Sequence, residues 1–406
     1  MTRPLALLLC VVGLLGLLGG CAAGSGMAAA GTGTDGHSLS RSWVLDPSYY
    51  AQSVQGHLGL MRASRRLDSW LQDPDTPERL RQRLLRAQEI RAFASSDLML
   101  PRNASYTRYA DLGRRAVVWN VVAAPPYQLE LAQWCFPFAG CVGYRGYYSE
   151  EAARQFAASL PPGSDVAVYP VPAYSTLGWL NWLGGDPLLN TFIHYPEVEL
   201  ARLLFHELAH QKLFVPGDTA FNESFATAVE DLGGQLWMRE RASPEARAEF
   251  FTFDERRNAF RQLMRGTRAE LQVVYAQSAS ASGADTSALA QAKAEVMARF
   301  HQRYQALKTS WGGFAGYDAW VSQANNALFA VHAAYDEFVP GFVALYRRVV
   351  AEHGEGDAAW QAFYSRATEL SRLPKPERHE ALRALAGNSQ AGLSAHPAFL
   401  RLPSAR

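Results

Sequence analysis

The 406-residue sequence predicts an α+β fold that is predominantly α-helical. Three observations support this prediction: several long segments have amphipathic helical periodicity, two short valine-rich apolar segments lie in the middle of the chain, and the C-terminal third is mostly helical in character. Hydrophobic residues make up 48% of the chain, which is enough for a substantial core. We therefore expect a small sheet, then the helix that carries the motif described below, then a helical C-terminal part.

The N-terminus has the features of a bacterial export signal. Residues 1–20 contain one arginine, a short glycine-containing apolar run that is poorly suited to span a membrane, and then small residues, as in a signal peptide. Residues 18–21 are Leu-Gly-Gly-Cys, which resembles a lipobox, so we expect cleavage before Cys21 and lipidation of its thiol. An ordinary secretory signal cleaved at a later alanine is the alternative. Because Ala22 rather than aspartate follows, we expect an outer-membrane lipoprotein of the bacterial cell envelope that faces the periplasm.

The rest of the chain is expected to contain a tether, one domain and a tail. Residues 21–42, rich in Gly, Ala and Ser, form a flexible tether. Residues 43–376 form a single domain, in which about 244–307 are a helical hairpin insertion with an exposed tip, and residues 377–406 form a C-terminal tail. The net charge of +1 gives no electrostatic reason to expect nucleic acid as a partner.

The expected elements before the motif are one helix and two strands. Residues 76–98 form an amphipathic helix with Thr76 as its N-cap. Residues 116–128 form a buried strand that two prolines end, and residues 165–180 form a second strand. Two helices follow, at 196–214 and 218–238, separated by the breaker sequence Val-Pro-Gly-Asp.

Two cysteines remain after the signal peptide and the lipidated residue. Cys135 and Cys141 lie six positions apart, and an oxidising compartment allows them to pair, so we expect a disulfide. A metal-binding pair is the alternative, although it would need further cysteines or histidines nearby.

The most specific signal is a His-Glu-Leu-Ala-His sequence on the helix expected at 196–214. His206 and His210 are four residues apart and so share one helix face, where they can bind one metal ion together. Glu207, beside that face, would take a proton from the attacking water and give it to the leaving amine. Catalytic zinc uses three protein ligands, and Glu223 on the next helix is the candidate third ligand. A helix with two solvated or core-bonded histidines is the alternative.

Two further acidic residues lie on the second helix. Glu230 is seven residues after Glu223 and so on the same face, where it could orient an imidazole ligand from behind. Asp218 is better placed to cap the start of that helix.

The motif, together with Phe-Asn-Glu-Ser-Phe-Ala around Glu223, resembles that of the gluzincins, zinc peptidases with two histidines and one glutamate as ligands. The twelve residues between His210 and Glu223 are fewer than in their aminopeptidase branch. The whole chain is similar to a family of bacterial predicted aminopeptidases that are often lipoproteins. This resemblance implies a gluzincin-like metallopeptidase domain, one zinc ion per chain and a peptide substrate. The similar stretches are 90–112, 117–127, 134–148, 172–179, 205–211, 218–230 and 325–342.

The resemblance also implies roles for residues outside the motif. In gluzincins an edge strand just before the zinc helix aligns the substrate through backbone hydrogen bonds, which assigns Tyr174, Ser175 and Thr176 to substrate binding; a buried strand end is the alternative. An oxyanion stabiliser on a later helix is also implied, and Tyr335 is our choice, with a core tyrosine as the alternative. Its competitors are Tyr195 and Tyr317.

We therefore expect a lipid-anchored zinc metallopeptidase, an aminopeptidase by resemblance, with Glu207 as general base. An endopeptidase and a non-catalytic zinc-binding envelope lipoprotein are the alternatives, although the intact Glu207 argues against the second. An aminopeptidase needs a carboxylate for the substrate amine, and Asp186, Glu197 and Glu199 are the candidates nearby in sequence. Residues 144–148 could close one end of the cleft. The expected partners are a peptide substrate and, through the lipid, the membrane; the sequence carries no signal for an oligomeric state.

Overall fold

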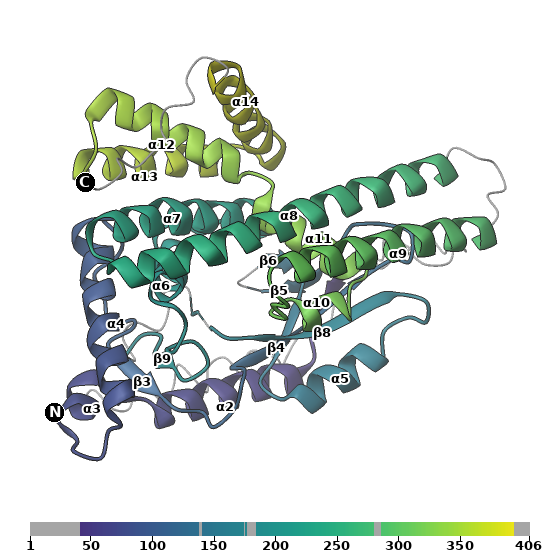
Figure 1. Ribbon diagram of the computed structural model, residues 1–406. Coiled ribbons are helices and arrows are strands. Elements are labelled where there is room, and N and C mark those ends of the chain that lie inside the picture. The colour runs from purple at the N-terminus through teal and green to yellow at the C-terminus, as the bar shows by residue number, and fades with distance from the viewer. Residues whose placement is uncertain (1–40, 138–139, 174, 177–183, 280–285, 394–406) are drawn as a thin grey trace, which may run out of the picture. The chain divides into compact units, whose positions relative to one another are not determined.

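Helices form most of the described residues, and the strands are short and belong to three small sheets (Figure 1). The prediction of a predominantly helical α+β fold is confirmed. This computed structural model describes residues 41–137, 140–173, 175–176, 184–279 and 286–393. The helices are α2 (Pro47–Ala63), α3 (Leu67–Gln72), α4 (Glu78–Ser96), α5 (Glu150–Ala158), α6 (Glu197–Lys212), α7 (Thr219–Glu240), α8 (Pro244–Ala279), α9 (Thr286–Ser310), α10 (Asp318–Val321), α11 (Asn326–Asp336), α12 (Val339–His353), α13 (Asp357–Arg372) and α14 (Lys375–Leu393). The strands are β1 (Ser42–Trp43), β2 (Arg65–Arg66), β3 (Arg108–Ala110), β4 (Val118–Ala124), β5 (Trp134–Phe136), β6 (Gly140–Val142), β7 (Arg145–Tyr147), β8 (Asp165–Val171) and β9 (Leu188–Leu189).

The largest antiparallel pairing is in the sheet with the strand order β7-β4-β8, which is antiparallel throughout. Successive side chains of β4 point to opposite faces. Trp119 and Val121 pack with residues of α5, whereas Val122 and Ala124 pack with residues of α11. These two helices explain why the valine-rich strand is almost completely buried. Val118 and Asn120 lie on the same face of β4 but precede Val122 in the strand, and they line a cleft instead of packing against α11.

Helices α6 and α7 are neighbours in the largest hydrophobic cluster of the described residues (Figure 1). Contacts with α4, α7 and α8 bury α6 around most of its circumference. Two glycines of α7 allow this close approach. A Cβ atom on Gly233 would lie 2.9 Å from the Phe205 ring, and one on Gly234 would lie 2.7 Å from Arg202 Cγ. The two helices therefore lie close enough for their polar side chains to meet directly.

The C-terminal region contains a further packed helix. Residues 377–406 were expected to be a tail, but the described part of this segment belongs to α14, which packs against α12 (Figure 1). Leu382 is fully buried, and its carbonyl oxygen would be only 2.4 Å from a Cβ atom on Gly341. The physical reason is that apolar positions at helical spacing in this segment face α12.

The N-cap expected at Thr76 is wrong. Helix α4 begins at Glu78, and Pro77 occupies the N-cap position without a side-chain hydrogen bond. The Thr76 hydroxyl instead donates to the carbonyl of Trp70 in α3 at 2.7 Å. This bond stabilises the turn between α3 and α4 rather than the helix end.

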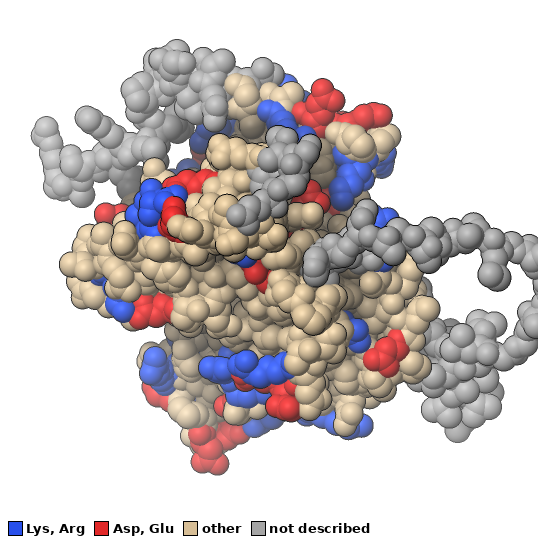
Figure 2. Space-filling view, turned by 90° about the vertical axis from the view of Figure 1, so that its right-hand side faces the viewer, with Lys and Arg blue, Asp and Glu red and all other residues tan. Residues whose placement is uncertain are grey.

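Residues 1–40, which include the expected signal peptide, Cys21 and most of the tether, lie outside the described residues. Within the described ranges, no helix combines the length and the hydropathy needed to cross a membrane. On the face shown in Figure 2, basic and acidic side chains are interspersed, in keeping with a net charge of +1.

Candidate metal centre

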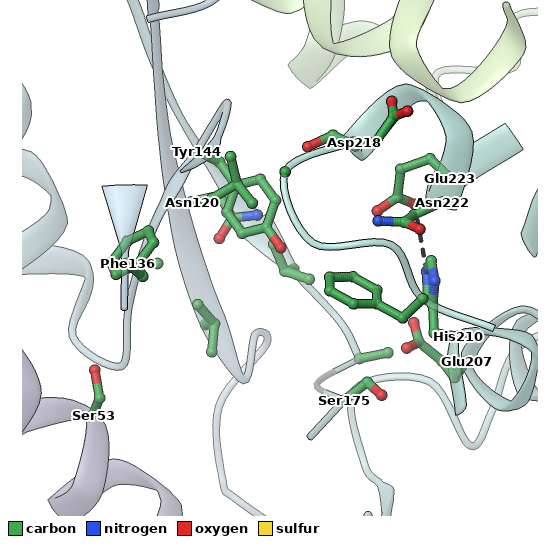
Figure 3. A pocket seen from close by; sticks show the side chains of 18 of the residues that line it. Ser53, Asn120, Phe136, Tyr144, Ser175, Glu207, His210, Asp218, Asn222 and Glu223 are labelled. Atoms are coloured by element: carbon green, nitrogen blue, oxygen red, sulfur yellow. Dashed lines mark ion pairs between the residues drawn. The ribbon is translucent and has the colours of Figure 1, made fainter. Parts of the chain in front are cut away.

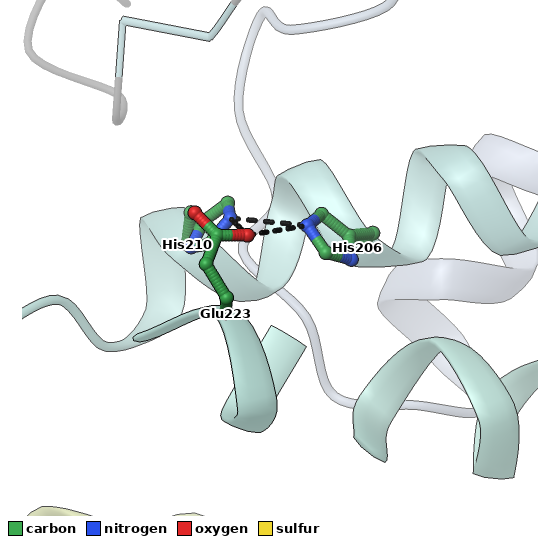
Figure 4. A group of neighbouring side chains, drawn as sticks. All are labelled: His206, His210 and Glu223. Carbon is green, nitrogen blue, oxygen red and sulfur yellow. Dashed lines mark hydrogen bonds and ion pairs between the residues drawn. The ribbon is translucent and has the colours of Figure 1, made fainter. Parts of the chain in front are cut away.

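Two histidines of α6 and one glutamate of α7 form a buried group that could hold a metal ion. His206 and His210 are one turn apart and lie beside Glu223 (Figure 4). Glu223 Oε2 is 3.3 Å from His206 Nε2 and 3.6 Å from His210 Nε2, and the two Nε2 atoms are 3.2 Å apart. A tetrahedral metal centre with bonds of about 2.0–2.1 Å separates its ligand atoms by roughly 3.3 Å. The three residues therefore fit a metal ion in both donor chemistry and spacing.

The turn between the two helices brings Glu223 over α6. Gly217 in this turn has a φ of +78°, a conformation that glycine adopts at little cost. Asn222 closes the turn, because its side chain accepts the N–H of Val215 and donates to the carbonyl of Val215, both at 2.8 Å. Asp218 accepts a backbone N–H of the first turn of α7, so the prediction that it caps this helix is confirmed.

The carboxylate of Asp218 also ties the start of α7 to the C-terminal helix. Arg378 Nε lies 3.2 Å from this carboxylate, and His379 Nε2 lies 2.9 Å from it. Asp218 is 1% exposed, so the cationic Arg378 from α14 offsets the cost of burying its charge. The start of the helix that carries Glu223 is therefore fixed by contacts with α14.

Glu230 orients one of the candidate ligands from behind. Its Oε2 lies 2.9 Å from His206 Nδ1, which leaves His206 Nε2 directed at the candidate metal position. Arg202, whose side chain is 3% exposed, donates to Glu230 Oε1 at 2.7 Å and to Asp231 at 2.5 Å. The contacts of Glu230 are those expected for a residue that positions a histidine ligand of a metal ion.

The charges within this group alter its titration. Burial alone would lower the pKa of His206, but hydrogen bonds to Glu223 and Glu230 and their negative charges raise it well above its usual value. Burial alone would raise the pKa of Glu223, but the charge of His210 and hydrogen bonds to both histidines hold it far below its usual value. Burial raises the pKa of Glu207, which makes its carboxylate a stronger base than an exposed one. The site thus combines a strongly ionised ligand with a neighbouring basic carboxylate.

The group faces a cavity of about 470 Å³ that His206, Glu207, His210 and Glu223 help to line (Figure 3). A volume of roughly 300–1,000 Å³ is typical of sites for small ligands. Figure 3 shows Glu207, His210 and Glu223 on one side of this pocket and Phe136 on the opposite side. A substrate can therefore reach both the candidate ligands and Glu207 from the same space.

The segment expected to align the substrate borders this cavity. Val171, Ala173 and Ser175 line it, as the alternation of an extended chain requires. The backbone N–H of Thr176 donates to the Asp186 carboxylate at 3.1 and 3.2 Å. Tyr174, the third residue assigned to substrate binding, lies outside the described residues.

Asp186 links this segment to the helix of the motif. Gln211, which directly follows His210, donates to Asp186 Oδ2 at 3.1 Å. Burial raises the pKa of Asp186 to about 6, and its hydrogen bonds with Thr176 only partly offset this effect. Asp186 therefore holds the segment at 175–176 beside α6, and its carboxylate does not line the cavity.

The other two carboxylates considered for the substrate amine also point elsewhere. Glu197 pairs with Arg86 at 2.6 Å, and Glu199 pairs with Arg257 at 2.7 Å. Neither glutamate is among the described residues that line the cavity. Within the described lining the carboxylates are those of Glu207, Glu223 and Asp218. Glu223 contacts both histidines, and Asp218 caps α7 and contacts α14.

The tyrosines considered for the oxyanion have different surroundings. Tyr335 lies in α11, and its side chain is outside the described residues. Tyr195 is 37% exposed, and Tyr317 stacks on Phe260 with ring centroids 4.1 Å apart. Neither of these two lines the cavity.

Tyr144 is a cavity residue that the sequence interpretation did not single out. Its ring projects into the pocket between Phe136 and the candidate ligands (Figure 3). Tyr144 is 37% exposed, but the cleft partly desolvates its hydroxyl, and this desolvation together with the negative charge of Glu223 raises the pKa of that hydroxyl. The group therefore keeps its proton and can donate to a bound substrate. The one signal in the sequence was its place in the 144–148 segment, which was expected to close one end of the cleft.

A disulfide fixes the part of the chain that precedes Tyr144. Cys135 and Cys141 are bonded across strands β5 and β6, and they face each other in the register of the two strands. Phe136 and Val142, each next to one of these cysteines, line the cavity. The disulfide therefore constrains one wall of the cleft.

A family model described as "Putative aminopeptidase" matches residues 48–382, and the chain belongs to this family. The match includes both helices of the candidate metal centre and the segments that form the cleft. No curated protein and no solved structure matches the chain. The family supports a peptidase activity, and the site described above is where such an activity would be located.

Proposed function

We propose that the protein is a zinc-dependent metallopeptidase, most consistent with an aminopeptidase. The observation that carries this proposal is the buried group of His206, His210 and Glu223, which shares one cavity with Glu207. Two imidazole nitrogens and one carboxylate oxygen match the donors of catalytic zinc sites, so one zinc ion per chain is proposed. When bound, zinc supplies Lewis-acid chemistry that polarises the scissile carbonyl and acidifies water.

The residues of the chain have separate tasks in this proposal. Glu207 accepts a proton from the attacking water and later donates it to the leaving amine, and its raised pKa suits a base. Glu230 holds His206 in the tautomer that keeps Nε2 available. The extended segment that contains Ser175 borders the cavity, where it supports binding of the substrate backbone.

An endopeptidase is the second candidate, and one observation favours it. Among the described residues that line the cavity, every carboxylate has a partner or role at the metal centre or at the start of α7. None is left to hold a free α-amine. Cleavage that does not depend on a free amino terminus would identify this second function.

The test compares wild type with Glu207→Gln. Both proteins are expected to retain one equivalent of zinc, while turnover of the variant falls by about 10²–10⁴-fold, because the general base is lost. Zinc is measured by mass spectrometry of the dialysed protein, and cleavage is measured on a peptide library in free and N-acetylated forms. Glu240→Gln, on the exposed end of α7, serves as the control and is expected to behave as wild type.

The outcomes separate the candidates. Release of single N-terminal residues from free peptides alone supports an aminopeptidase, whereas internal cuts in both forms support an endopeptidase. Zinc-loaded wild type that cleaves no peptide, or Glu207→Gln with full turnover, would contradict the proposed mechanism.

We also propose that a lipid on Cys21 holds the protein at the outer membrane on the periplasmic side. The Leu-Gly-Gly-Cys sequence that ends the apolar run supports this proposal. In bacterial cells, Cys21→Ala is expected to move the protein from the membrane fraction to the soluble fraction. Retention of this variant in the membrane fraction would argue against the anchor.

A further inference from the structure

The side of the cavity opposite the candidate metal ligands is lined mainly by aromatic side chains. Tyr49 and Tyr50 come from α2, Phe136 comes from β5, and Tyr144 and Tyr148 flank β7. Figure 3 shows Phe136 on the side of the pocket opposite His210 and Glu223, with Tyr144 between them. We call this surface the aromatic wall. We propose that it is a side-chain pocket for a large aromatic or branched apolar residue of the peptide next to the scissile bond; this inference rests on the proposed peptidase function.

The aromatic wall is held in place before any substrate binds. The Tyr49 ring lies 5.6 Å from Phe136 and 5.7 Å from Tyr50, at centroid separations typical of packed aromatic pairs. The Tyr50 hydroxyl donates to the carbonyl of Val44 at 2.6 Å. The disulfide of Cys135 constrains the strand that carries Phe136. Pre-formed apolar surfaces of this kind bind apolar groups without the cost of ordering loops.

The charges of the cavity favour an uncharged side chain. Among the described lining residues there is no lysine or arginine, while Glu207, Glu223 and Asp218 contribute carboxylates. An acidic side chain, or the carboxylate of a C-terminal residue, would lose its water shell without gaining a lysine or arginine partner from the described lining. A large apolar side chain has no such cost, and it gains the free energy of burial against the rings.

The sheet forms the floor of the pocket, and a glycine keeps it open. Gly146 of β7 pairs with Asn120 of β4, and both line the cavity. A Cβ atom on Gly146 would lie 3.0 Å from Val118 Cγ1 and 3.2 Å from Asn120 Oδ1. Any side chain at position 146 would therefore press on the floor of the pocket and reduce its volume.

The test uses two variants with opposite effects on the pocket. Phe136→Ala removes a ring from the aromatic wall, and Gly146→Val narrows the pocket. Phe251→Ala is the matched control, because Phe251 is a 48% exposed phenylalanine of α8 that does not line the cavity. The substrates are free and N-acetylated peptides that differ only at the two residues flanking the cleaved bond, with Phe, Leu, Ala, Glu or Lys at each position.

Zinc-loaded wild type and Phe251→Ala are expected to cleave the Phe or Leu peptide with a kcat/KM about 10–100-fold above that for Ala, with Glu lowest. Phe136→Ala should reduce the preference for Phe at least severalfold, and Gly146→Val should remove it while Ala peptides are still cleaved. A kcat/KM that is equal for Phe, Ala and Glu in wild type would overturn the pocket and leave the peptidase proposal intact.

A binding measurement keeps the two proposals separate. Metal-free protein is titrated with N-acetyl-phenylalanine amide and with N-acetyl-alanine amide, and binding is followed by NMR chemical shifts and saturation transfer. We expect the phenylalanine compound alone to bind wild type and Phe251→Ala, and to bind Phe136→Ala at least severalfold more weakly. Such binding together with no cleavage of any peptide would contradict the peptidase and support the pocket. Equal binding of both compounds, or no effect of Phe136→Ala, would overturn the pocket.

Discussion

The two sides of the cleft are built in different ways. On the metal side, charged groups from two adjacent helices are connected by short contacts, such as His206 Nδ1 to Glu230 at 2.9 Å and Arg202 to Glu230 at 2.7 Å. On the opposite side, the aromatic wall is held by ring packing, such as the 5.6 Å separation of Tyr49 and Phe136, and by a disulfide. The structure of the metal side depends on matched charges, whereas the structure of the aromatic side depends on the packing of rings.

This difference has consequences for mutation. A buried charge that loses its partner retains its full cost of desolvation, so single changes on the metal side are expected to have large effects. A ring that loses one neighbour forfeits only part of its contact area, so changes on the aromatic side are expected to have graded effects. If the two sides are independent, a change on one side should leave the property of the other side unaltered.

The largest effect is expected from Glu223→Ala. This change removes one of three candidate ligands and leaves His206 and His210 with no carboxylate between them. Removal of a residue that only orients a ligand already costs about 10–100-fold in metal affinity, so loss of the ligand itself should exceed that range. Zinc affinity is measured by competition with a chelator, and Glu240→Ala on the same helix is the control.

Two results would argue against Glu223 as the third metal ligand. Full zinc occupancy in Glu223→Ala would mean that another residue is the third ligand. An equal loss of zinc in the Glu240→Ala control would mean that the affinity responds to general changes in α7 rather than to this contact.

The sequence predicted that His206, His210 and Glu223 meet because these residues are close in sequence. The four-residue spacing of His206 and His210 sets their common face by helix geometry alone. The prediction that Glu223 joins the two histidines required one further assumption, that the glycine-containing turn reverses the chain. Helix α7 does return alongside α6. Glu230 follows from its spacing of seven residues on the same helix, and it does contact His206.

The aromatic side could not be derived in the same way. Tyr49 and Tyr144 are distant in sequence, and nothing local to either residue indicates that the two line one cavity. Periodicity reports which face of an element is apolar but not which element lies opposite. Asp186 shows the same limit: it lies near the motif in sequence, but its carboxylate binds the Thr176 N–H rather than facing the cleft.

The assignment of Tyr335 rested on resemblance rather than on local spacing. Its side chain lies outside the described residues, so its role stays a prediction. The cavity offers Tyr144 as a hydroxyl donor from a part of the chain that precedes the metal helices. A tyrosine suited to the cleft was therefore present in the 144–148 segment, which was expected only to close one end of the cleft.

The smallest effect is expected from replacing both Cys135 and Cys141 by serine. A short loop closed by a disulfide stabilises the folded state by about 2 kcal/mol, mainly by restricting the unfolded chain, so the free energy of unfolding should fall by about this amount. If the two sides of the cleft are independent, zinc affinity should match that of wild type, while the preference for Phe over Ala peptides should weaken because Phe136 is less constrained. Denaturant unfolding, chelator competition and kcat/KM ratios measure the three quantities.

One contact between the two sides of the cleft makes the double cysteine variant a demanding test of their independence. Gly140, beside Cys141, packs so closely on the turn before α7 that a Cβ atom there would lie 2.8 Å from the backbone nitrogen of Gly217. Loosening the hairpin could therefore disturb the turn that positions Glu223. A drop in zinc affinity that matches the loss of selectivity would show that this contact couples the two sides, and the cleft would then behave as one unit. Unchanged zinc affinity with reduced selectivity would show that the metal side is held by its own hydrogen bonds and ion pairs.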